Sequence, residues 1–91
     1  MITASFAPGD AALARAVDDL ETAVRGSLDH LEPAARASVR RSLATLDSAI
    51  AQAAARQNAS PGDPGAARYL TSTLRKKLQL LRTVSQLAQQ S

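Results

Sequence analysis

The sequence lacks cysteine and tryptophan, and it contains one histidine, one phenylalanine and one tyrosine. Without thiols there is no disulfide framework, no Cys-based zinc site and no thiol nucleophile. His30 has Asp29 and Glu32 beside it in sequence, but adjacency alone does not build a catalytic triad. We expect this stretch to form a turn between helices. No glycine-rich loop of the kind that cradles phosphate is present either. We therefore expect no enzymatic activity and no metal, nucleotide or covalent cofactor.

Long apolar runs are also missing. No stretch approaches the roughly 20 residues of a membrane-spanning helix. Residues 1–5 have neither the basic start nor the apolar core of a secretory signal. We expect a soluble, cytoplasmic protein that does not insert into membranes.

Large core-forming side chains are scarce. Of 41 apolar residues in a chain of 91, 20 are alanine and 12 are leucine. This length suits one domain, 1–91, with residues 1–9 expected to be flexible. Because alanine buries little area, we expect a monomer of marginal stability.

Proline and glycine divide the chain into three segments, each with apolar residues recurring every three or four positions. The predicted helices cover 10–29, 33–57 and 64–90. The fold class is all-α, with the second and third helices forming a long antiparallel hairpin and the shorter first helix packed across or beside it. Asp10 and Asp63 are the expected N-caps of the first and third helices, and Pro33 is expected in the first turn of the second.

The first two helices each show a single narrow apolar stripe, which suits one neighbouring helix. The stripe of the first helix consists of Leu13, Val17, Leu20, Val24, Leu28 and Leu31. The stripe of the second helix consists of Val39, Leu43, Leu46, Ile50 and Ala53.

The third helix has a wider apolar arc that divides into two stripes. Leu70, Leu74, Leu78 and Leu81 are expected to close the hairpin against the second helix. Tyr69, Leu80, Val84 and Leu87 form the second stripe. Because an exposed apolar patch marks a partner or self-association site, we expect this second stripe to bind a protein partner or a second copy of the chain.

Charge is unevenly distributed: residues 1–32 carry a net charge of −4, residues 33–63 carry +2 and residues 64–91 carry +5. This complementarity predicts that the first helix lies near the third. Arg75, Lys76 and Lys77 are contiguous and therefore point around the helix, with Lys77 inside the apolar arc. Since aromatic stacking residues are also nearly absent, we expect no nucleic-acid binding.

Several stretches carry a family likeness. They are LETAV at 20–24, AARASVRRSLATL at 34–46, a loop ending in proline, and the pair Tyr69-Leu70 followed by LRKKLQLLRTVSQL at 74–87. In order, size and spacing the chain resembles the small bacterial co-chaperones of type III secretion needle subunits. The resemblance implies a helical hairpin that forms a heterodimer with a helical-repeat chaperone and keeps the needle subunit unpolymerised.

Two other interpretations remain open at this point. Needle and inner-rod subunits are also helical hairpins, with proline-containing turns such as SPGDPGAARY at 60–69, although the chain ends soon after Leu87, where a needle subunit would continue. The long first helix and the basic third helix depart from the co-chaperone pattern. An unrelated helical adaptor is the second alternative.

Overall fold

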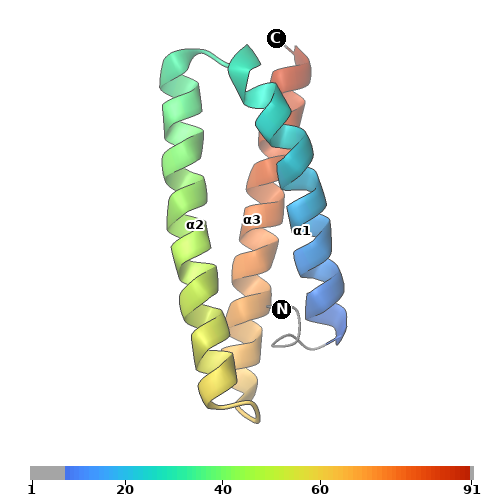
Figure 1. The fold of residues 1–91 in the computed structure, drawn as a ribbon, viewed down its shortest axis with the longest axis vertical. Coiled ribbons are helices and arrows are strands. Elements are labelled where there is room, and N and C mark those ends of the chain that lie inside the picture. The colour runs from blue at the N-terminus through green and yellow to red at the C-terminus, as the bar shows by residue number, and fades with distance from the viewer. Residues whose placement is uncertain (1–7, 91) are drawn as a thin grey trace.

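The computed structural model describes residues 8–90, which form three long helices and one short helical turn (Figure 1). These elements are α1 (Pro8–Ser27), the 3-10 turn η2 (Leu28–His30), α2 (Pro33–Ala59) and α3 (Pro64–Gln90). No strand occurs within this range, so the predicted all-α class is confirmed. The molecule is elongated, with principal extents of 45 × 20 × 20 Å.

The helix α3 lies between the other two. Both α1 and α2 pack along α3, whereas α1 and α2 barely touch each other. Figure 1 shows that α2 runs antiparallel to α3, forming the predicted hairpin, and that α1 runs parallel to α3. The predicted position of the first helix, beside the third, is therefore confirmed.

Local sequence signals set the ends of α2 and α3. The backbone N–H of Gly65 donates to Asp63 Oδ1 at 2.9 Å, so Asp63 caps α3 as predicted. Pro33 occupies the first turn of α2, where its missing N–H leaves no helical hydrogen bond unmade. At its other end α2 continues to Ala59, two residues beyond the predicted end.

The start of α1 differs from the prediction. The helix begins at Pro8, so Asp10 is not its N-cap but lies in its first turn. There the Asp10 carboxylate accepts a 2.6 Å hydrogen bond from the Thr71 hydroxyl of α3. The Asp10 side chain, which the local sequence predicted to cap α1, therefore makes a tertiary hydrogen bond to α3 instead. The expected flexibility of residues 1–9 lies outside the described residues for 1–7, while Pro8 and Gly9 belong to α1.

The main hydrophobic core draws on all three helices. Its buried members are Val17, Val24, Leu28, Leu43, Leu81 and Val84. A smaller cluster of Ala53, Leu70 and Leu74 lies nearer the α2–α3 turn. Every residue of the stripe predicted for the first helix lies in the main core or packs against it.

The two sides of α3 face different helices. Tyr69 lies under the Arg56 guanidinium of α2, with 5.5 Å between Cζ and the ring centroid, whereas Thr71 bonds to α1. At about 100° per residue, Leu80 and Val84 share the side of Tyr69. The wide apolar arc of α3 therefore serves two neighbours within the chain, rather than one neighbour and an external partner.

Removal of the α3 cap tests this account of the hairpin. Replacing Asp63 by Ala should lower the free energy of unfolding by about 1 kcal/mol, because the amide of Gly65 loses its acceptor. For a domain of this size that corresponds to a fall in Tm of about 4–8 °C by circular dichroism. Asp63→Asn is the matched control, since Asn also caps well; an equal loss in both variants would contradict a capping role.

Candidate functional site

The four residues expected to bind a partner do not form one exposed surface. Val84 is only 1% exposed, and Leu80 is half-buried against the main core. Tyr69 and Leu87 are exposed, at 39% and 49%, but they lie about 27 Å apart along α3. The expectation that Val84 belongs to an external surface is wrong, because α1 and α2 together cover it.

A cluster of charges joins all three helices near their middle. Lys77 Nζ of α3 lies 2.7 Å from Glu21 Oε1 of α1 and 2.5 Å from Asp47 Oδ1 of α2. Arg25 adds a second contact to Glu21, at 3.0 Å from Oε2. We call Glu21, Arg25, Asp47 and Lys77 the ion cluster. The Lys77 side chain is 7% exposed, so its charge is balanced within the protein instead of by water.

Burial and pairing act in opposite directions on the two central groups. Burial alone would raise the pKa of Glu21, but hydrogen bonds and charge from Lys77 and Arg25 bring that pKa below its ordinary value. Burial alone would lower the pKa of Lys77, but Asp47 and Glu21 bring that pKa above its ordinary value. Both side chains are therefore charged at neutral pH, and the Glu21 carboxylate forms an ion pair with the Lys77 ammonium.

This arrangement fits a structural role better than a chemical one. Within residues 8–90, no three histidine or acidic side chains gather where they would hold a metal ion. The sequence had one signal for the cluster, the lysine at 77 inside an apolar arc. Because α3 itself contains no acid, its partners had to come from other helices, and sequence alone does not say which.

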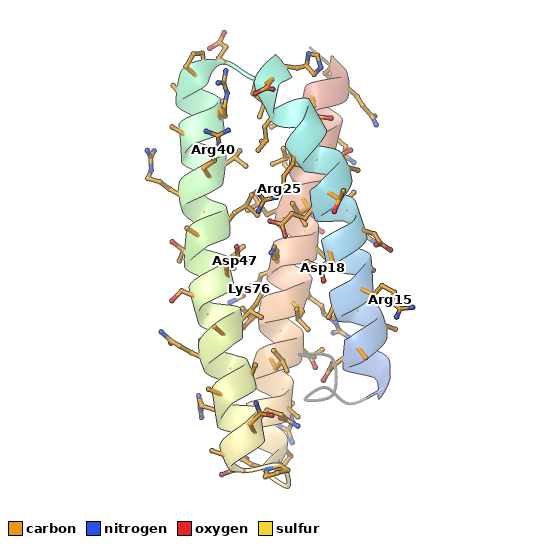
Figure 2. The ribbon with its side chains drawn as sticks, viewed as in Figure 1. Arg15, Asp18, Arg25, Arg40, Asp47 and Lys76 are labelled. Atoms are coloured by element: carbon orange, nitrogen blue, oxygen red, sulfur yellow. The ribbon has the colours of Figure 1, made fainter. Side chains whose placement is uncertain are left out.

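A groove runs between α1 and α2 beside the ion cluster. It encloses a hollow of about 340 Å³. Its lining residues are Arg25, Leu28, Arg40, Leu43, Ala44 and Asp47. Figure 2 shows Arg25 on α1 directed toward α2, on which Arg40 and Asp47 lie. The groove thus combines buried leucines at its base with charged groups of both signs at its rim.

The face of α3 turned away from the other helices is basic and polar. Its exposed residues include Arg68, Arg75, Lys76 and Arg82. A shallow hollow of about 680 Å³ follows this face, and its described lining residues all belong to α3. From the sequence, these charges were expected to face the acidic first helix and not to bind nucleic acid, and no other binding surface was assigned to them.

Comparison of the chain with family models, with curated proteins and with solved structures gives no match. None of the described helices is both long and apolar enough to cross a membrane.

The position of Val84 yields a direct test. Val84→Asp should unfold the protein or destabilise it by several kcal/mol, because the new carboxylate is buried among Val17, Val24 and Leu43 with no cation beside it. Leu87→Asp, on the same helix and half exposed, should keep the helical circular dichroism and most of the stability. Equal behaviour of the two variants in urea unfolding would show that α1 and α2 do not cover Val84.

The ion cluster yields a second test. Lys77→Ala should cost about 3 kcal/mol of unfolding free energy, because it leaves Glu21 and Asp47 without their shared cation. Lys77→Met should cost less, since it keeps the apolar stem while removing the charge. Asp47→Asn should cost about 1 kcal/mol or less, because that carboxylate is half exposed.

The same cluster predicts how stability varies with pH. The lowered pKa of Glu21 contributes stability that is present at neutral pH and lost as pH falls through that pKa. The raised pKa of Lys77 contributes stability that is present below its ordinary value of 10.5 and lost as pH rises through the folded value. In Lys77→Met the alkaline loss should be reduced in urea titrations at a series of pH values. An unchanged alkaline profile would exclude Lys77 as its source.

Proposed function

We propose that this protein is a non-enzymatic, cytoplasmic co-chaperone that holds an α-helix of a protein partner in the groove between α1 and α2. The observation that carries the proposal is the packing of α1 and α2 on α3 without packing on each other. An additional helix laid in that groove would contact both and complete a four-helix bundle.

The lining of the groove suits such an occupant. Leu28 and Leu43 supply an apolar base, and Ala44 on the α2 side is small enough to let another helix approach. Arg25, Arg40 and Asp47 at the rim select partners by charge without supplying most of the affinity. The described lining of the hollow thus combines an apolar base with charged groups at its rim, which suits the binding of an amphipathic helix.

The resemblance to co-chaperones of type III secretion needle subunits names the specific partner. In that proposal the chain forms a heterodimer with a helical-repeat chaperone, and together they keep the needle subunit from polymerising. Support comes from the confirmed α2–α3 hairpin, which matches the architecture of that family, and from the quoted stretches at 20–24, 34–46 and 74–87. The groove replaces the Tyr69, Leu80, Val84 and Leu87 stripe as the main contact surface.

Blocking the groove tests the proposal. The protein is co-expressed with a needle subunit and its helical-repeat chaperone, and complexes are isolated by size exclusion. Wild type should give a soluble complex, and Ala44→Trp should reduce its yield at least about tenfold, because the indole occupies space that a partner helix needs. Ser38→Trp is the matched control: Ser38 is exposed on the same helix, lies about 120° from Ala44 on the helical wheel and does not line the groove.

Three outcomes would contradict the proposal. Failure to form any complex would remove the co-chaperone role, and equal loss in both tryptophan variants would remove the groove as its site. Growth of fibres by the purified chain alone would instead favour a needle or inner-rod subunit.

A further inference from the structure

The outward face of α3 has a regular pattern. Arg68, Arg75 and Arg82 recur every seven residues, which places them about 10.5 Å apart in a nearly straight row. Ser72, Gln79 and Gln86 alternate with them at steps of four and three. All six are exposed. We call these six residues the arginine seam.

The positive charge of the seam is not balanced within the described chain. None of its arginines forms an ion pair there; the three ion pairs all belong to the ion cluster. Residues 64–91 contain no acid, so no neighbour on α3 offsets the charge. The acids of α1 that face the core are used by Lys77 and Thr71. The seam is therefore available to an external anion.

The seam and the groove lie on opposite sides of the molecule. Lys77 points toward α1 and α2, and Arg75 and Gln79 are each turned from it by about 200° on the helical wheel. A partner on the seam would therefore leave the groove open, and both surfaces can be occupied at once.

We propose that the arginine seam is a docking surface for an acidic α-helix of another protein. The three arginines lie in one nearly straight row, so an occupant that pairs with all of them must present carboxylates about 10.5 Å apart on one side, as an α-helix with an acid every seven residues does. Its facing side should carry carboxylates at seven-residue intervals, which the planar guanidinium groups bind with two hydrogen bonds each.

A nucleic acid fits the seam less well. Duplex DNA carries one negative charge per roughly 1.7 Å of its axis, whereas the seam offers one arginine per about 10.5 Å. It also contains no aromatic side chain on which bases could stack.

Two helical peptides of about 22 residues test the proposal. In one, glutamates line a single face at seven-residue intervals; in the other, the same residues are distributed around the helix. Fluorescence anisotropy and amide-shift mapping follow their binding at about 50 mM and about 300 mM salt. The lined peptide should bind at least about tenfold more tightly at low salt, weaken as salt rises, and shift the amides of α3.

Charge-reversal variants assign the binding to the seam. Arg75→Glu combined with Arg82→Glu should weaken binding of the lined peptide at least about tenfold, while Arg41→Glu, on an exposed part of α2, should change it less than about twofold. Because all three positions are exposed, circular dichroism should show unchanged helix content in every variant. Ala44→Trp should leave peptide binding unchanged, so the proposals for the seam and for the groove are tested independently.

Several results would overturn the inference. Equal affinity for the two peptides would show general charge attraction without helix recognition. An equal effect of Arg41→Glu would place the binding elsewhere. Tighter binding of a duplex DNA probe through Arg75 and Arg82 would assign the seam to nucleic acid, and dimerisation of the wild type that Arg75→Glu abolishes would assign it to a second copy of this chain.

Discussion

Burial of one ammonium group is the constraint on which the arrangement of the three helices depends. Lys77 is carried into the interior by the periodicity of α3, and an unpaired charge there would be too costly to keep. Its two carboxylates come from different helices, Glu21 from α1 and Asp47 from α2. A one-residue slip of either helix would separate an acid from the lysine. The apolar stripes bring the helices together, and the ion cluster adds a polar constraint on their register.

The number of neighbours around α3 explains most of the remaining architecture. With α1 on one side and α2 on the other, the wide apolar arc is covered and Val84 becomes core. Because the two flanking helices do not pack on each other, the chain keeps a groove on one face. The opposite face of α3 has no neighbouring helix within residues 8–90, and its arginines are exposed. Both proposed binding surfaces thus result from the central position of α3 between α1 and α2.

Features governed by nearby residues could be predicted from sequence. The cap at Asp63 and the start at Pro33 depend on a few adjacent backbone groups, and both were correct. Asp10 shows where such local prediction fails. Its position predicted an N-cap, but its carboxylate accepts a hydrogen bond from Thr71 on another helix. Val84 shows the same limit for packing: a helical wheel gives the width of an apolar arc but not the number of helices that share it. For Lys77, the sequence showed a charged residue inside an apolar arc but did not identify the acids that pair with it.

A small core and an open groove have a common thermodynamic consequence. The chain is rich in alanine, and its three helices leave one side of the bundle unfilled, so much of the burial that a four-helix bundle would gain is absent. A helix bound in the groove would add that burial and stabilise only the folded state. At a free concentration of about 100 times Kd, such a partner adds roughly 2.7 kcal/mol of stability. For a domain of this size that is a large share of the total, so under the proposed function folding and partner capture are coupled.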